Sequence, residues 1–254
     1  MTQLQQLCEK SIEVVKDAGR FIREEVGKVS GQSIEEKSLN SLVSYVDREA
    51  EQRLVEGLGR LLPGSTFLTE EDTVDNQDSP QQWIIDPLDG TTNFLHQLPC
   101  FSVSVALQEE GQTVLGIVYE INQDECFYAW RGGGAHLNGR PIRVSRTKRL
   151  ADALIATGFP YHDYQWIGPY FDILEHFMQH SRGIRRFGSA AVDLAYVACG
   201  RFDAFFEYSL HPWDVAGGAF LIQEAGGRID DFHGGGNYLH GRQIVAANAD
   251  LFHE

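Results

Sequence analysis

The sequence predicts a layered fold of the α+β class, in which helices and β-sheets alternate. Three observations favour it. Apolar residues recur at helical spacing over residues 4–22, which predicts an amphipathic helix. Apolar runs separated by short polar turns fill residues 101–130, which is typical of an antiparallel meander. In the second half, short strand-like runs alternate with helix-like segments, a pattern that implies stacked layers.

The same apolar patterns predict the helices and strands of the first half. A second helix is expected over residues 47–62, and the polar stretch 31–40 between the two helices is expected to be a mobile loop. The predicted strands are residues 67–69, 83–85, 101–107, 113–120 and 125–130.

The second half predicts strands at residues 154–158, 202–207, 228–230 and 243–248, with helices at 164–180 and 189–199. A further helix of small and apolar residues follows Asp214 and closes at Gly226 and Gly227. No internal repeat or long linker divides the chain. We therefore expect one domain, residues 1–254, with subdomains 1–145 and 146–254 that meet in the basic stretch RVSRTKRL.

Composition and charge exclude several classes of function. The 254 residues are 43% hydrophobic and 22% charged, as in an ordinary globular protein, and the formal net charge is −15. That charge argues against nucleic acid or an anionic membrane as the main partner, because both would repel the protein. Four scattered cysteines without a CxxC pair indicate neither a disulfide framework nor a zinc site. With no apolar run long enough to span a bilayer, we expect a cytoplasmic protein.

The most informative motif is WIIDPLDGTTNFLH, residues 83–96. An apolar strand leads to Asp86, and Pro87 limits the turn so that Asp89 points to the same side. Gly90 permits close backbone approach, and the threonines that follow are typical helix openers whose N–H groups can face an anion. Two carboxylates beside such a backbone nest indicate metal-assisted phosphoryl chemistry, although Asp-Pro and Asp-Gly are also common turn formers.

Two other segments carry acidic residues at the expected ends of elements. Glu70 and Glu71 follow the short strand 67–69, and Asp214 lies at the start of the helix after Pro212 and Trp213. A carboxylate at a helix start is also explained by capping alone. The sequence contains no GxxxxGK[ST] loop, GxGxxG turn, GxSxG elbow or HExxH pair.

Together these segments resemble the inositol monophosphatase family of metal-dependent phosphatases. The most specific matches are DPLDGTTNF at residues 86–94 and WDVAGGAFLIQEAGG at 213–227, with FLTEED at 67–72 as support. Weaker agreement is found at residues 42–47 and 187–207. The resemblance covers nearly the whole chain. It implies an alternating sandwich of helices and sheets, with two subdomains meeting over the active site.

The resemblance also implies a set of metal ligands. Glu70, Asp86 and the backbone carbonyl of Leu88 would hold one Mg²⁺, and Asp86, Asp89 and Asp214 a second. Such oxygen ligands suit Mg²⁺ rather than zinc. Lys37 matches a family position near a third, weaker metal site, although a lone loop lysine is usually just solvated.

The same comparison implies catalytic and substrate-binding roles. Glu70 and Thr91 would orient and deprotonate the attacking water, with Asp47 acting through Thr91. The predicted substrate contacts are Asp89, Gly90, Thr91, Ser189, Ala190 and Glu207. Glu207 matches a family glutamate that contacts sugar hydroxyls. The alternative interpretation is that Glu207 is an exposed carboxylate at a strand end.

Three functions stay open at this stage. The first is a Mg²⁺-dependent phosphatase acting on inositol monophosphate or a similar sugar-alcohol phosphate. The second keeps the chemistry but acts on fructose 1,6-bisphosphate, histidinol phosphate, nicotinamide dinucleotide phosphate or adenosine 3′,5′-bisphosphate. The third is a non-catalytic regulatory protein of the same fold. The resemblance further implies a homodimer and inhibition by lithium.

Overall fold

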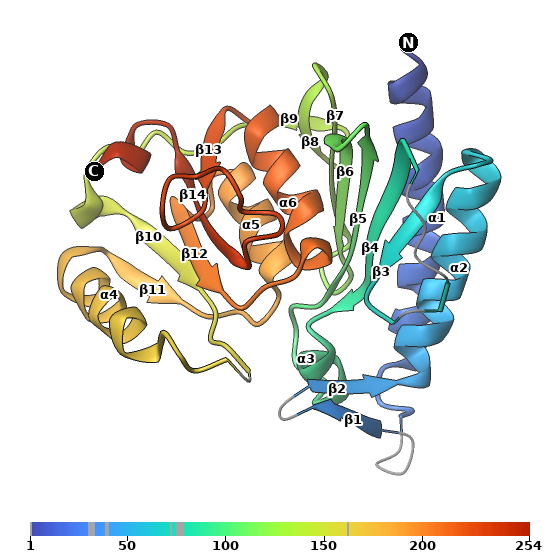
Figure 1. The fold of residues 1–254 in the computed structure, drawn as a ribbon, viewed down its shortest axis with the longest axis horizontal. Coiled ribbons are helices and arrows are strands. Elements are labelled where there is room, and N and C mark those ends of the chain that lie inside the picture. The colour runs from blue at the N-terminus through green and yellow to red at the C-terminus, as the bar shows by residue number, and fades with distance from the viewer. Residues whose placement is uncertain (1, 30–33, 39–40, 72, 75–78, 162) are drawn as a thin grey trace.

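The computed structural model describes residues 2–29, 34–38, 41–71, 73–74, 79–161 and 163–254. For residues 34–38 and 41–42 it describes the backbone alone. Five layers alternate across the molecule: a helix pair, a large sheet, a second helix pair, a smaller sheet and a single outer helix (Figure 1). This arrangement confirms the predicted layered α+β fold.

The larger sheet has seven strands in the order β3-β4-β5-β6-β7-β8-β9. Only β3 and β4 are parallel; each later pair is antiparallel. This confirms the predicted meander. The strands are β3 (Thr66–Thr69), β4 (Gln81–Asp89), β5 (Ser102–Glu109), β6 (Gln112–Glu120), β7 (Glu125–Trp130), β8 (Gly134–Leu137) and β9 (Arg140–Ile142).

Helices α1 (Gln3–Glu25) and α2 (Tyr45–Leu61) cover the outer face of this sheet, as their apolar spacing predicted (Figure 1). The Thr2 side chain caps α1, and Ser44 caps α2 in a capping box with Asp47. Leu54 and Leu58 of α2 and Val15 of α1 have no exposed surface and belong to one cluster with strand residues of the sheet. Burial of the apolar stripes therefore holds this layer in place.

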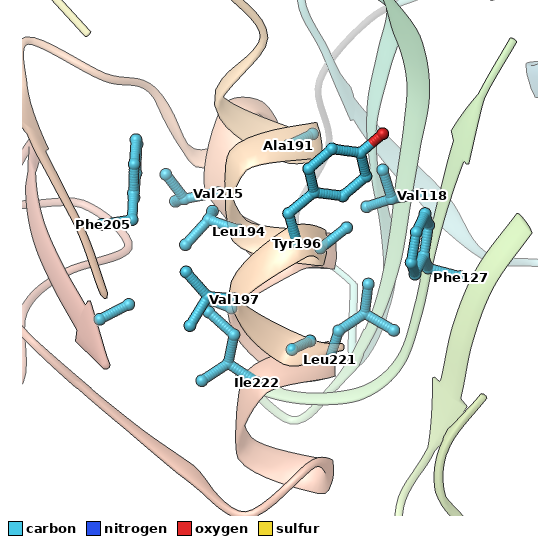
Figure 2. Packing of buried hydrophobic residues seen from close by; sticks show 14 of the residues in the cluster. Val118, Phe127, Ala191, Leu194, Tyr196, Val197, Phe205, Val215, Leu221 and Ile222 are labelled. Carbon is cyan, nitrogen blue, oxygen red and sulfur yellow. The ribbon is translucent and has the colours of Figure 1, made fainter. Parts of the chain in front are cut away.

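The smaller sheet has five strands in the order β11-β10-β12-β14-β13. They are β10 (Leu154–Thr157), β11 (Gly183–Arg185), β12 (Ala204–Tyr208), β13 (Gly227–Asp230) and β14 (Gln243–Asn248). Helix α4 (Ile167–His180) packs on the outer side, while α5 (Ala190–Ala198) and α6 (Pro212–Glu224) lie between the two sheets (Figure 1). Figure 2 shows α5 and α6 side chains packed between Phe205 on one side and Val118 and Phe127 on the other.

Glycines in α6 explain how this helix fits between the layers. A Cβ on Gly116 of β6 would lie 2.7 Å from the carbonyl oxygen of Gly217 in α6. A Cβ on Gly218 would lie 2.5 Å from the Cβ of Leu194 in α5. Adjacent glycines therefore let α6 approach the large sheet on one side and α5 on the other. This close packing fixes the start of α6, where Asp214 is found.

Two sequence-based expectations need correction. The expected loop at 31–40 is wrong over Ile34–Ser38, which forms strand β1 and pairs with β2 (Ser41–Ser44), while residues 30–33 and 39–40 lie outside the described chain. The apolar periodicity was too weak in this polar stretch to reveal a hairpin. The short strands β8, β9 and β11 were not predicted either.

The two sheets draw on separate parts of the sequence, residues 66–142 and 154–248. The predicted subdomain boundary at 145/146 lies in the segment between them. It stays a prediction, because α5 and α6 come from the second half but pack on both sheets. None of the helices that the structure describes combines the length and apolar character needed to cross a membrane.

Candidate active site

A pocket of about 320 Å³ opens where the large sheet meets α5, α6 and the smaller sheet. It brings together ten of the eleven residues predicted for the site; the eleventh, Asp47, lies behind it. The predicted residues in its wall are Glu70, Asp86, Leu88, Asp89, Gly90, Thr91, Ser189, Ala190, Glu207 and Asp214. Lys37 belongs to β1, and its side chain lies outside the described part of the structure.

A β-bulge places two of the carboxylates on the same face of the sheet. Strand β4 does not end at Asp86, as the sequence suggested, but continues to Asp89. Asp86 pairs with Ser104 of β5 and Asp89 pairs with Ser102, so β4 carries one extra residue between them. Because Ser102 and Ser104 are two residues apart, the bulge turns both aspartates to one side. Pro87 suits this position, since a bulge frees a residue from ladder bonding.

Helix and strand ends bring the other acidic groups to the same place. Asp214 is in the first turn of α6, and its Oδ2 accepts a hydrogen bond of 2.7 Å from the backbone N–H of His211. Glu70 directly follows β3. The fully buried carboxylate of Glu51 in α2 holds the next residues, because it accepts hydrogen bonds from the N–H groups of Glu71 and Thr73. Asp214 therefore caps α6, as one interpretation of the sequence predicted, and it also lies in the pocket wall.

These carboxylates strongly affect one another. Burial raises the pKa of Asp86 well above its usual value, and the charges of Glu70, Asp89 and Asp214 raise it further. Burial and the charges of Asp89 and Glu70 likewise raise the pKa of Asp214. Within the described part of the chain, no lysine or arginine forms an ion pair with Asp86, Asp89 or Asp214. The cluster therefore carries concentrated negative charge that a cation would relieve.

Asp89 is held from the opposite side of the pocket by the start of α5. Its Oδ2 accepts hydrogen bonds of 2.7 Å from the Ser189 hydroxyl and from the N–H of Ala191. Burial raises the Asp89 pKa to about 6 although these hydrogen bonds act to lower it. Ser189 also caps α5 by accepting from the N–H of Val192. Asp89 thus joins the large sheet to the helix layer between the two sheets.

Thr91 connects the pocket to a buried carboxylate. Its hydroxyl lies 3.0 Å from Oδ1 of Asp47 and 3.0 Å from the carbonyl oxygen of Leu88. Asp47 is 1% exposed, and its other oxygen accepts two hydrogen bonds of 2.8 Å from Ser44. Burial raises the Asp47 pKa, against the opposing effect of its hydrogen bonds to Ser44 and Thr91. The predicted contact between Asp47 and Thr91 is therefore present.

Gly90 takes a conformation that few other residues tolerate. Its φ is +95°, and a Cβ would lie 3.0 Å from the carbonyl oxygen of Cys100 and 3.2 Å from that of Gly188. The short helix α3 (Thr91–Leu95) begins at the next residue. The backbone at residues 90–92 borders the pocket. Because Gly90 has no side chain, this turn can pack closely against the carbonyl groups of Cys100 and Gly188.

Glu207 is buried, at 8% exposure, on β12. It faces Gly158 at the end of β10, where an added Cβ would overlap both carboxylate oxygens of Glu207. Burial, and then the charges of Asp214 and Asp89, raise the Glu207 pKa. The alternative of an exposed strand-end carboxylate is therefore wrong.

Several residues in the pocket wall were not among the predicted contacts. Gly158, Tyr161 and Arg186 border the cavity, and so does Asp193, which was considered from the sequence but not included among the predicted contacts. Arg186 is the one arginine or lysine among its described lining residues, and it donates a hydrogen bond of 3.1 Å to the Tyr161 hydroxyl. The paired arginines just before FGSA, and the glycine after the strand 154–157, were signals in the sequence that could have indicated these positions.

The donor set fits magnesium. All of the candidate ligands are oxygens, from carboxylates and one backbone carbonyl, and Mg²⁺ prefers such hard ligands. The mutual raising of the carboxylate pKa values indicates a site that favours a bound cation at neutral pH. Among the described residues, no three His, Cys, Asp or Glu side chains are already arranged around one point as ligands. The fit therefore rests on the chemistry and proximity of the donors.

Known proteins are similar to this chain in sequence and in fold. The model of the inositol monophosphatase family matches residues 3–254. An inositol-1-monophosphatase from Mesorhizobium japonicum is 42% identical over 93% of this chain and 90% of its own length. The Nus factor SuhB of Escherichia coli K12 is 41% identical over 94% of this chain and 90% of its own length. The crystal structure of the extragenic suppressor protein suhB from Bartonella henselae superposes with a TM-score of 0.90 at 42% identity, covering 94% of this chain and 92% of that one.

The fold and its acidic pocket define the class of protein as an inositol monophosphatase-like phosphatase. The family match extends over almost all of the sequence and over both sheets. The chain belongs to the inositol monophosphatase family.

Proposed function

We propose that this protein is a Mg²⁺-dependent phosphomonoesterase that hydrolyses inositol monophosphate or a similar sugar-alcohol phosphate. The observation that carries the proposal is the cluster of Asp86, Asp89 and Asp214, which lines one pocket together with a further carboxylate, Glu207. The three aspartates therefore suit a cation with its phosphate, and Glu207 suits a polar leaving group. The names of the relatives support the same substrate class.

Mg²⁺ would be held by the side chains of Glu70, Asp86, Asp89 and Asp214 and by the backbone carbonyl of Leu88. When bound, two such ions would lower the pKa of a water molecule and offset negative charge on the phosphoryl group. The chain's own contribution is to fix these oxygens. The bulge in β4 fixes Asp86 and Asp89, and the first turn of α6 fixes Asp214.

Thr91 and Asp47 form the proposed path for the proton of the attacking water. The Thr91 hydroxyl has a single proton, and Asp47 and the Leu88 carbonyl are both within reach as acceptors. Donation to Asp47 leaves a lone pair on Thr91 Oγ directed at the water. The water proton then moves to Thr91 as the Thr91 proton moves to Asp47, with Glu70 orienting the water.

The phosphate would rest on the backbone N–H groups of Gly90 and Thr91, which both border the pocket. Ser189 and Ala190 lie across the pocket; Ser189 acts chiefly by holding Asp89, and Ala190 lines the wall. Glu207 would accept hydrogen bonds from hydroxyls of the leaving alcohol. In this way the pocket separates phosphate binding from recognition of the alcohol.

A second candidate is a regulatory protein of the same fold. Relatives of almost equal identity carry the name Nus factor SuhB, which names no reaction. The two functions differ in what they require of the pocket. A regulator does not need Asp86, Asp89, Thr91 and Asp214 together, and this chain retains all four in one pocket. We therefore favour the enzyme.

Phosphate release from a substrate panel tests the proposal. The panel holds inositol 1-phosphate, fructose 1,6-bisphosphate, histidinol phosphate, adenosine 3′,5′-bisphosphate and nicotinamide dinucleotide phosphate, each with and without Mg²⁺. We expect metal-dependent release, highest with inositol 1-phosphate, and its loss in Asp89→Asn and Asp214→Asn variants that stay folded. Preference for another member would move the function to that substrate. The absence of release from all of them would favour the regulator.

A cytoplasmic location, a homodimer and inhibition by lithium are further proposals that follow from the family. Light scattering of the purified protein measures the oligomeric state. A lithium titration at fixed Mg²⁺ measures inhibition, and cell fractionation measures location. Each of these can fail without affecting the proposed chemistry.

A further inference from the structure

Asp193 is a buried carboxylate that the proposed chemistry does not use. It lies in α5, is 1% exposed and borders the pocket. Its Oδ1 has no hydrogen-bond partner within the described structure. A buried polar atom without a partner destabilises the folded protein, and native proteins retain few of them. A carboxylate in a pocket wall that has one oxygen without a partner therefore indicates a ligand that supplies the missing hydrogen bond.

The surroundings keep Asp193 in this position. Every residue of α5 is buried, and Leu194 and Val197 of that helix pack among the side chains of α6 and β12 (Figure 2). The Ser189 side chain caps the start of the helix. Because the helix cannot turn without losing this packing, the carboxylate stays next to the cavity in the absence of a ligand.

The neighbours of Asp193 define what could bind. Burial raises its pKa well above the usual value, and the charges of Glu207 and Asp89 raise it further, while Arg186 has the opposite effect. Asp193 and Glu207 both line the cavity, although they come from α5 and β12. Arg186 makes no ion pair with either in the described structure; its Nη2 donates to Tyr161.

The chemistry of this region favours hydroxyl groups. Carboxylates accept hydrogen bonds, and hydroxyls can donate to two neighbouring carboxylates without adding negative charge. A second phosphate on the leaving group would be repelled by the same two residues.

We propose that Asp193 is a specificity-determining residue that, together with Glu207, accepts hydrogen bonds from hydroxyls of the leaving alcohol and selects a neutral polyol. This inference rests on the proposed phosphatase function and adds Asp193 to the residues that recognise its substrate. A substrate without the corresponding hydroxyl would leave a buried carboxylate unpaired. Sites built in this way discriminate strongly against analogues that lack the hydrogen-bonding group.

The test compares Asp193→Ala with the wild type on two substrates, inositol 1-phosphate and p-nitrophenyl phosphate. Alanine suits this position because α5 is already rich in alanine. We expect the ratio of kcat/KM for the polyol over the aryl substrate to fall by about tenfold or more in the variant. A ratio that stays within about twofold of the wild type would overturn the proposal, because the loss of one hydrogen bond to a charged group changes kcat/KM by more than about twofold.

A matched control is Asp203→Ala. Asp203 is also buried, at 7% exposure, but its carboxylate accepts hydrogen bonds from the Ser145 hydroxyl and the N–H of Leu154, and it does not line the pocket. Its substitution should lower Tm and leave the substrate ratio unchanged. Asp193→Ala should keep or raise Tm, because it removes an unpartnered charge. An equal change of ratio in both variants would assign the effect to general loss of packing and overturn the proposal.

Deoxy analogues of inositol 1-phosphate provide a test without relying on the variant's stability. For the wild type, removal of the hydroxyl that meets Asp193 should lower kcat/KM by about tenfold or more, and no further loss should follow in Asp193→Ala. If no single hydroxyl matters in the wild type while inositol 1-phosphate is still hydrolysed, the inference fails and the phosphatase function stands. If the wild type hydrolyses neither test substrate, the phosphatase function fails and takes the inference with it.

Discussion

Ser189 donates a hydrogen bond of 2.7 Å to Asp89 across 100 positions of sequence. The bond ties the end of β4 in the large sheet to the first turn of α5, between the sheets. Asp89 therefore has its orientation set by the opposite layer and not by its own strand alone. The proposed metal ligand and the helix cap are parts of one structure.

Ser189→Ala should weaken metal binding without unfolding the protein. The N–H of Ala191 still donates to Asp89, so the carboxylate keeps part of its support. Groups that orient metal ligands typically change affinity by about 10-fold or more when they are removed. We expect the Mg²⁺ concentration for half-maximal activity to rise by roughly that factor. Ser189→Thr, which retains a hydroxyl, is the control, and an unaltered Mg²⁺ requirement in Ser189→Ala would contradict the argument.

Asp47→Asn should lower kcat more than it raises KM. The amide cannot take a proton from Thr91, so the proposed path ends there, and general-base contributions are typically about 10²- to 10⁴-fold. Thr91→Ser keeps the hydroxyl and should retain most activity, whereas Thr91→Val should resemble Asp47→Asn. Steady-state kinetics at saturating Mg²⁺ distinguish these cases. Full kcat in Asp47→Asn would show that the Asp47 carboxylate only caps α2.

Gly158→Ala should alter the preference among alcohols. The added methyl group would occupy the space of the Glu207 carboxylate, which must then move. The expected result is a loss of kcat/KM for polyol phosphates similar to that of Glu207→Gln, by about tenfold. Gly168→Ala in α4 is the control, because a Cβ there meets nothing within 4 Å. If both glycine variants gave the same kinetics as the wild type, Glu207 would have no part in recognition.

The metal-free protein should lose stability as pH rises. Burial and like charges raise the pKa values of Asp86 and Asp214, and burial raises that of Asp89 to about 6, whereas an unfolded aspartate titrates near about 4. The folded state therefore binds more protons in this window, and the free energy of unfolding falls as pH passes from about 4 to above 6.

Bound Mg²⁺ should reverse this trend, because it favours the ionised carboxylates. Thermal unfolding in EDTA and in Mg²⁺ across pH 5–8 measures the effect. We expect the increase in Tm caused by Mg²⁺ to grow with pH in the wild type and to grow less in Asp214→Asn. A Tm difference that is constant or shrinks with pH would contradict the assignment of these carboxylates to a cation site.

Much of the architecture could be predicted from local patterns. The apolar stripe of α1, the meander from β5 to β7 and the small-residue helix α6 were all expected, because amphipathic period and turn residues are local properties. The hairpin β1–β2 was missed, since polar strands carry no such period. The acidic positions Glu70, Asp86, Asp89 and Asp214 could be found because their motifs lie next to a predicted strand or a predicted helix start, although β4 in fact continues to Asp89.

Only the tertiary structure revealed which groups act together. Local sequence does not indicate that Asp193 lacks a partner, that Gly158 makes room for Glu207, or that Glu51 supports the residues after Glu70. Each of these relationships joins segments far apart in the chain, and each depends on how two sheets pack around α5 and α6. Periodicity along the sequence records which face of an element is buried, whereas the partner that it meets is decided by packing of the whole fold.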